Sequence, residues 1–104
     1  MNFGLTDETI IAICAVLTTC PAIESAILYG SRAMGTHKPG SDIDLTLTGN
    51  NLTQSDIAEI AIGLDDLLLP YQIDLSILNE IDNPDLRAHI NRVGKPFYRK
   101  NIHD

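Results

Sequence analysis

Apolar and polar residues follow two different periods along this chain. In three stretches the apolar residues recur at the spacing of an amphipathic helix: 6–20, 53–69 and 84–93. In four shorter stretches they form apolar runs or alternate with polar residues, as in strands: 25–29, 42–48, 72–78 and 95–99. A short helix is expected directly after the first strand. The pattern predicts the order helix, strand, short helix, strand, helix, strand, helix, strand, which is an α+β arrangement.

Capping residues and prolines mark the ends of the predicted helices. Thr6 and Thr53 are expected N-caps, and Asp56 with Thr53 resembles a capping box with a shorter acid. Apolar residues continue at helical spacing as far as Leu68. The second long helix is therefore predicted to end only at Pro70.

Two aspartates share one face of the strand predicted at 42–48. Asp42 and Asp44 alternate with apolar residues, so both carboxylates are expected to point away from the core. A later strand repeats the Ile-Asp-Leu pattern around Asp74, which lands on the same face if the two strands are neighbours. The predicted architecture is a small mixed β-sheet with helices packed on one face and the acidic residues on the other.

Neighbouring carboxylates favour the binding of a cation. They repel each other unless a positive charge lies between them. Magnesium prefers such hard oxygen ligands and is often held by one or two carboxylates together with substrate phosphates. A third carboxylate would allow two ions to bind. Solvated aspartates on an edge strand remain the alternative for each acid taken alone.

A Gly-Ser pair ends the first predicted strand. Gly30 removes a Cβ where the backbone must approach a ligand, and Ser31 begins the short helix with a hydroxyl. The N-terminus of a helix attracts anions, so this turn is a candidate phosphate-binding element. An ordinary glycine turn with an N-capping serine remains the alternative for the dipeptide alone.

Composition narrows the choice of function. The 104 residues are expected to form one domain, 1–104, and 44% of them are hydrophobic, as is usual for a globular protein. The net charge of −7 argues against direct binding to nucleic acid. Two cysteines are too few for a secreted disulfide framework, and no signal peptide or membrane span is visible. We therefore expect a cytoplasmic protein.

The motifs taken together resemble those of a known family. A Gly-Ser pair, ten residues, an Asp-x-Asp and a third Asp on a later strand are similar to the nucleotidyltransferase superfamily related to DNA polymerase β. Gly-Ser-Arg-Ala-x-Gly followed by Ser-Asp-Ile-Asp-Leu looks most like the minimal nucleotidyltransferases, often called MntA-like. The resemblance covers roughly residues 23–99.

The resemblance implies a polymerase β-like catalytic lobe and a role for each motif residue. The catalytic and metal-binding residues would be Asp42, Asp44 and Asp74. The residues that hold the nucleotide phosphates would be Gly30, Ser31 and Arg32. Met34 stands where many relatives carry a second arginine, and this departure would weaken the phosphate contacts.

The resemblance also implies an activity and a partner. The protein would transfer AMP from ATP to a hydroxyl of a partner protein, using two Mg²⁺ ions. The partner would be a helical HEPN protein, so that the pair forms a hetero-oligomer and a toxin–antitoxin system with this chain as antitoxin. The alternative is a non-catalytic nucleotide-binding or scaffolding subunit that neutralises a HEPN partner by contact alone. A small-molecule adenylyltransferase is less favoured, because no acceptor-binding domain is expected after Arg99.

Overall fold

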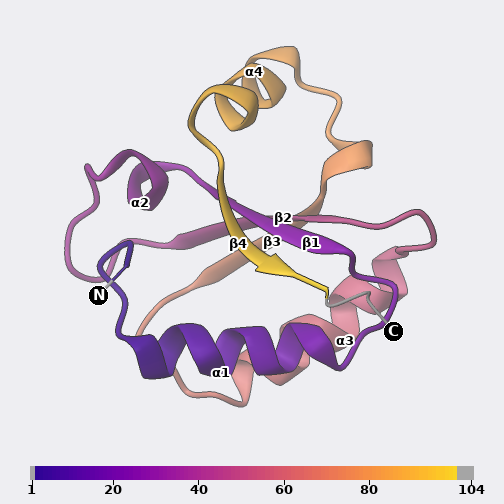
Figure 1. The fold of residues 1–104 in the computed structure, drawn as a ribbon, viewed down its shortest axis with the longest axis horizontal. Coiled ribbons are helices and arrows are strands. Elements are labelled where there is room, and N and C mark those ends of the chain that lie inside the picture. The colour runs from indigo at the N-terminus through magenta and orange to yellow at the C-terminus, as the bar shows by residue number, and fades with distance from the viewer. Residues whose placement is uncertain (1, 101–104) are drawn as a thin grey trace.

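A mixed four-stranded sheet lies at the centre of the computed structural model, which describes residues 2–100 (Figure 1). The strands are β1 (Ser25–Tyr29), β2 (Ile43–Thr48), β3 (Ile73–Ile77) and β4 (Lys95–Arg99). Their order across the sheet is β3-β2-β1-β4. Strand β1 pairs antiparallel with β2 and β4, whereas β2 and β3 are parallel. The predicted mixed sheet is confirmed.

Helices connect the strands in the predicted order. They are α1 (Asp7–Thr18), α2 (Ser31–Met34), α3 (Gln54–Asp65) and α4 (Pro84–Val93), with the short 3₁₀ helix η1 (Leu78–Glu80) after β3. The parallel pairing of β2 and β3 requires a crossover, and α3 supplies it. Among the described helices, none is both long and apolar enough to cross a membrane.

The main core lies between one face of the sheet and the helices α1 and α3. Buried apolar side chains of these helices meet those of β1 and β2: Ile13, Leu17, Ile60, Leu64, Leu28, Leu45 and Leu47. Figure 1 shows α1 and α3 on the same side of the sheet and α4 on the other. The prediction that helices pack on one face holds for α1 and α3. Helix α4 instead packs on the other face, against Ile27 and Tyr29.

Local capping signals are borne out at both long helices. The Thr6 side chain accepts a hydrogen bond from the backbone N–H of Thr9 at the start of α1. At the start of α3, Thr53 and Asp56 form a reciprocal capping box. These contacts satisfy backbone N–H groups that have no partner within the helix.

The predicted end of the second long helix is wrong. Helix α3 ends at Asp65, and Pro70 lies beyond a separate turn. In that turn the backbone N–H of Leu68 donates to the Asp65 carbonyl, and Leu68 adopts a left-handed φ of 55°. A left-handed residue cannot continue a right-handed helix, and the Leu68 side chain is 88% exposed instead of buried in the stripe.

Candidate active site

Asp44 and Asp74 lie side by side on neighbouring strands. The register of β2 and β3 pairs Asp44 with Asp74, so that the two Ile-Asp-Leu triplets lie abreast. Both carboxylates therefore belong to the face opposite the main core, because side chains alternate along a strand. Asp44 is half-buried and Asp74 is exposed, while Asp42 is exposed directly before β2 begins.

The environment of Asp44 disfavours a negative charge. Burial is the largest effect that raises the pKa of the Asp44 carboxyl, and hydrogen bonding to Asp74 raises it further. The charges of Asp74 and Asp42 act in the same direction, whereas His89 lowers the pKa. A cation between these carboxylates would lower their pKa values, because it stabilises their ionised forms.

The acidic residues fit a metal ion that is shared with a substrate. Among residues 2–100, no three Asp, Glu, His or Cys side chains stand close enough to hold a metal ion by themselves. Magnesium, however, is commonly bound by one or two carboxylates, with substrate phosphates completing its shell. The Asp44–Asp74 pair has this chemistry, and the predicted participation of Asp42 stays a prediction.

Gly30 packs directly against Asp44. The backbone of Gly30 has φ 77° and ψ −158°, a conformation that is essentially confined to glycine. A Cβ at this position would collide with the Asp44 carboxylate. Helix α2 begins at the next residue, Ser31. The Gly-Ser turn and the carboxylate pair, which are separate motifs in the sequence, therefore adjoin in the folded chain.

His89 lies beside the candidate site, although it belongs to none of the motifs found in the sequence. Its Nε2 accepts a hydrogen bond from the backbone N–H of Gly30 at 3.2 Å. Its ring meets Tyr29 edge-on, with the centroids 6.2 Å apart. A signal was present: Leu86, His89, Ile90 and Val93 follow helical spacing on one face of α4, so position 89 points inward.

Tyr29 completes a row of polar side chains across three strands. It pairs with Asp44 in the register of β1 and β2, as Asp44 pairs with Asp74. Burial is the largest of the effects on the Tyr29 hydroxyl, and it raises its pKa. The nearby hydroxyl of Ser76 opposes this shift, and the charges of Asp44 and Asp74 add to it. The structure thus places the half-buried Tyr29 beside the acidic pair.

Arg32 and Met34 occupy contrasting environments on α2. The Arg32 side chain is 2% exposed, and its guanidinium donates to backbone carbonyl oxygens of Phe3 and Ser41. Met34 is about half exposed at the end of the helix. The structure accounts for the Arg32 guanidinium without a nucleotide, and its predicted contact with phosphate stays a prediction.

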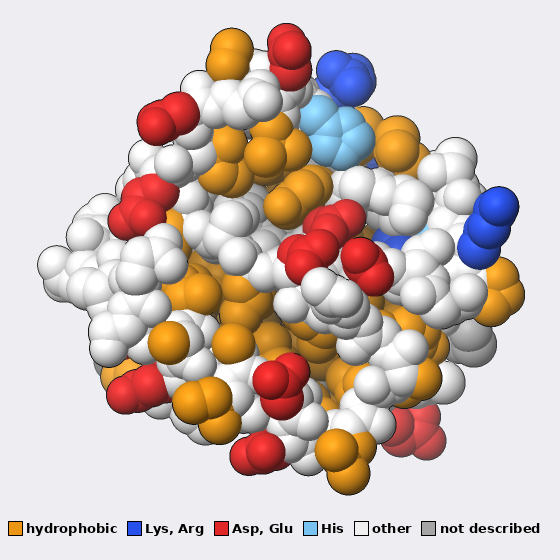
Figure 2. Space-filling view, turned by 180° about the vertical axis from the view of Figure 1, so that it is seen from behind, with side chains coloured by type: hydrophobic (Ala, Val, Ile, Leu, Met, Phe, Trp, Pro, Cys, Tyr) orange, Lys and Arg blue, Asp and Glu red, His pale blue; other side chains and the backbone are white. Residues whose placement is uncertain are grey.

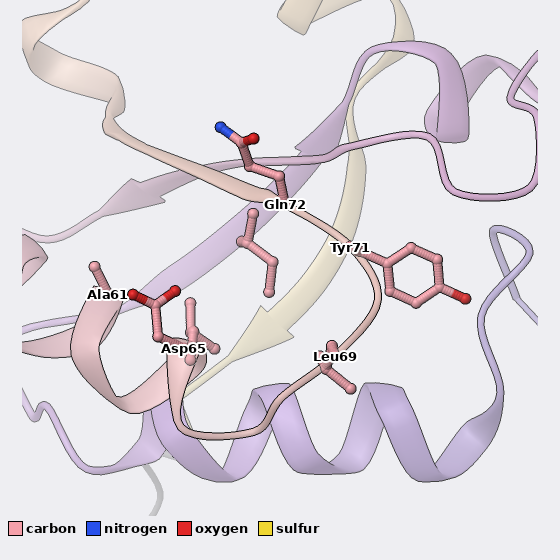
Figure 3. A pocket seen from close by; sticks show the side chains of 7 residues that line it. Ala61, Asp65, Leu69, Tyr71 and Gln72 are labelled. Carbon is pink, nitrogen blue, oxygen red and sulfur yellow. The ribbon is translucent and has the colours of Figure 1, made fainter.

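A hollow of about 420 Å³ lies between α3 and the segment that leads into β3. Figure 3 shows its wall: α3 contributes Ala61 and Asp65, and the segment leading to β3 contributes Leu69, Tyr71 and Gln72. Asp44 and Asp74 do not line it. Figure 2 shows acidic side chains spread over this side of the molecule. The carboxylate pair thus lies on an open face of the sheet and not in this hollow.

Solved structures of the same fold include toxin–antitoxin complexes. One is a crystal structure of a toxin–antitoxin with AMP-PNP, with a TM-score of 0.69 and 24% identity over 93% of this chain and 76% of that chain. Another contains a tri-AMPylated Shewanella oneidensis HEPN toxin in complex with an MNT antitoxin, with a TM-score of 0.67 and 20% identity over 92% of this chain and 74% of that chain. At these identities the similarity establishes the shared fold.

A further similar structure is that of a candidate minimal nucleotidyltransferase, with a TM-score of 0.60 and 27% identity over 92% of this chain and 96% of that chain. No curated protein matches the chain. The family model described as polymerase beta, nucleotidyltransferase matches residues 8–103. Both site motifs and nearly all of the sheet and helices fall within that match. The chain therefore belongs to the polymerase beta nucleotidyltransferase family.

Proposed function

We propose that this protein transfers AMP from ATP to a hydroxyl group of a partner protein, in a reaction that requires a divalent metal ion. The observation that carries the proposal is the contact between the two motifs. Gly30 lies so close to Asp44 that no Cβ fits between them, and Asp44 is paired with Asp74. A phosphate held at the Gly-Ser turn would therefore lie beside carboxylates that can share its cation.

Each residue has a defined part in this proposal. Gly30 and Ser31 hold the triphosphate, while Asp44 and Asp74, with Asp42, hold magnesium, for which two ions are expected. Bound Mg²⁺ neutralises phosphate charge and lowers the pKa of the attacking hydroxyl. That hydroxyl oxygen forms a bond to the α-phosphorus, the bond to the bridging oxygen breaks, and pyrophosphate leaves. Asp74, which is more exposed than Asp44, accepts the proton of the hydroxyl.

The charge of the chain supports a requirement for metal. With 14 acidic and 7 basic residues, the protein repels a free triphosphate. Burial raises the pKa of Asp44 most, and the charges of Asp74 and Asp42 add to it, so the site disfavours further negative charge. A divalent cation that offsets this repulsion is therefore expected to be needed for nucleotide binding and not for catalysis alone.

For the partner, we propose a helical HEPN toxin that this chain counteracts as an antitoxin within a hetero-oligomer. Support comes from the proteins of similar fold, which include an MNT antitoxin bound to a HEPN toxin that carries AMP groups. The acidic pair on an open sheet face, away from the hollow beside α3, also suits an acceptor supplied by a second protein.

The same openness favours one alternative function. The described residues form no metal cage around the carboxylates, and Met34 stands where the resemblance predicts a second arginine. A subunit that neutralises its HEPN partner by contact alone would need neither a metal site nor that arginine. Under this alternative, substitutions at Asp44 would leave neutralisation intact.

An intact-mass experiment separates the two functions. The protein is incubated with its HEPN partner, ATP and MgCl₂, and the mass of the partner is measured. We expect the partner to gain AMP with the wild type. The control variant Asp66→Asn, which changes an exposed acid at the C-terminal end of α3, should give the same gain. We expect no gain with Asp44→Asn. A stable complex without any gain in mass would refute the transfer and favour neutralisation by contact.

A further inference from the structure

Arg32 is a buried cation surrounded by backbone carbonyl groups. Its Nε and Nη2 donate to the carbonyl oxygen of Ser41 at 3.0 and 2.9 Å. Its Nη1 donates to the carbonyl oxygen of Phe3 at 2.7 Å. The guanidinium carbon lies 4.8 Å from the centre of the Tyr71 ring, in the geometry of a cation–π contact.

Two of these partners, Ser41 and Tyr71, adjoin the strands that carry the candidate site, whereas Phe3 lies in the turn before α1. Arg32 itself follows Ser31 in the Gly-Ser turn. Ser41 directly precedes Asp42 and the start of β2, while Tyr71 lies just before β3, which carries Asp74. One side chain therefore connects the phosphate-binding turn to the entrances of both carboxylate strands.

Besides the bonds from Arg32, the loop between α2 and β2 contacts a distant segment where the His37 ring packs against Gly4. Its hydrogen bonds near Ser41 are local: the backbone N–H of Ser41 donates to the Lys38 carbonyl, and the Lys38 N–H donates to the Ser41 hydroxyl. Gly35 and Gly40 both have positive φ and open space around them. Near the end of this loop, the two hydrogen bonds from Arg32 to the Ser41 carbonyl connect it to α2.

The chemistry of the contacts calls for arginine. A guanidinium presents several N–H donors in a rigid plane, so it can bind two carbonyl groups and stack on an aromatic ring at once. A lysine has a compact charge on a flexible stem and cannot reproduce that geometry. A buried charge is costly unless its donors are satisfied, so the favourable state of Arg32 requires all three partners to stay in place.

We propose that Arg32 is a positioning residue that sets the spacing between the Gly-Ser turn and the carboxylates of β2 and β3. It acts through the Ser41 carbonyl and the Tyr71 ring, and not by touching the nucleotide. The consequence for activity rests on the proposed function, whereas the connection between the three segments is tested without any nucleotide.

The first experiment compares Arg32→Lys with Arg87→Lys. Arg87 is a matched control because its Nη1 also binds two backbone carbonyl oxygens, those of Leu78 and Ile81, outside the three connected segments. Amide hydrogen exchange is followed in the nucleotide-free proteins. We expect exchange in residues 35–42 to accelerate by about tenfold or more in Arg32→Lys, as for the loss of one charged hydrogen bond, and to stay unchanged in Arg87→Lys.

The same two variants are then assayed for transfer at saturating ATP and MgCl₂. Because small displacements of reacting groups are costly, we expect the rate constant of Arg32→Lys to fall by about a hundredfold, with a smaller change in KM. A direct contact with phosphate would give the opposite result. Lysine would keep the charge, the loss would appear in KM, and exchange in the loop would be unchanged, which would overturn the proposal.

Variants of Tyr71 test the connection without altering a charge. Tyr71→Phe keeps the ring and is expected to behave as the wild type, whereas Tyr71→Leu removes the stacking surface and is expected to accelerate exchange in the loop. Combined with Arg32→Lys, the effect of Tyr71→Leu should be less than additive, because both changes break one contact. Full additivity would refute a shared role, and these variants also serve if Arg32→Lys does not fold.

The outcomes separate this proposal from the proposed function. If the wild type transfers no AMP but Arg32→Lys accelerates exchange in the loop, the function fails and the positioning of the segments stands. If the wild type is active and Arg32→Lys leaves both exchange and rate unchanged, the positioning role is refuted and the function stands.

Discussion

Replacement of Gly30 by alanine is the sharpest test of the contact between the two motifs. Two features of the structure oppose a side chain here. The backbone combines φ 77° with ψ −158°, which residues with a Cβ rarely adopt. The added Cβ would also overlap the Asp44 carboxylate, so either the turn or the carboxylate must move.

The magnitude follows from these two contributions. Holding a residue other than glycine in such a sparsely populated backbone region costs on the order of 1–3 kcal/mol. Overpacking against Asp44 adds about 1 kcal/mol or more, at the lower end of the usual range because this carboxylate is only half-buried. We therefore expect Gly30→Ala to lower the free energy of unfolding by roughly 2–4 kcal/mol.

Gly35→Ala provides a matched control. Gly35 also has a positive φ, 78°, but its ψ of 11° lies in the ordinary left-handed region and a Cβ there would meet open space. The expected loss is about 1 kcal/mol. Urea unfolding at equilibrium measures both variants, and transfer to the partner is assayed at a temperature where both are folded.

The two variants should differ in activity as well as stability. Gly30→Ala should lose transfer even where it is folded, because the turn and Asp44 cannot both keep their places. Gly35→Ala should keep transfer. If Gly30→Ala were no less stable than Gly35→Ala, the close packing of the turn on Asp44 would be refuted, and with it the structural basis of the proposed site.

Three further predictions follow from single side chains. Because burial, hydrogen bonding to Asp74 and nearby acidic charges raise the pKa of the Asp44 carboxyl above its unfolded value, the wild type should gain stability as the pH falls from above that raised pKa towards the ordinary value of 3.8. Asp44→Asn should lose this gain and be more stable than the wild type at neutral pH, which urea midpoints measured across the pH range would show. His89→Ala should raise the pKa of Asp44 further, since His89 lowers it, and an NMR titration of the Asp44 carboxyl that showed no rise would contradict an electrostatic interaction between His89 and Asp44. Leu68→Gly should stabilise the protein by about 1 kcal/mol, because φ is 55° and the side chain is exposed; a lower melting temperature would count against the left-handed turn.

Contiguous residues determined much of the architecture. The capping box at Thr53 and Asp56 and the helical spacing of apolar residues predict helices because the interacting groups are near neighbours in the chain. The alternation in 42–48 likewise assigns Asp44 to the face opposite Leu45, since side chains of a strand alternate. The end of α3 was misjudged because apolar spacing continues through Leu67 and Leu68 after the backbone has left the helix.

Tertiary structure decided which of these elements meet. The sequence placed Asp74 beside Asp44 only on the condition that their strands are neighbours, and the parallel register of β2 and β3 meets that condition. The contact of His89 with Gly30 joins residues 59 positions apart, and the bonds from Arg32 reach both the N-terminal turn and the start of β2. Local periodicity specifies the face on which a side chain lies, but only packing of the whole chain brings faces from distant segments together. By itself, then, the sequence determined the elements and the chemistry of the motifs, whereas the folded chain decided their distances and the further residues that hold them in place.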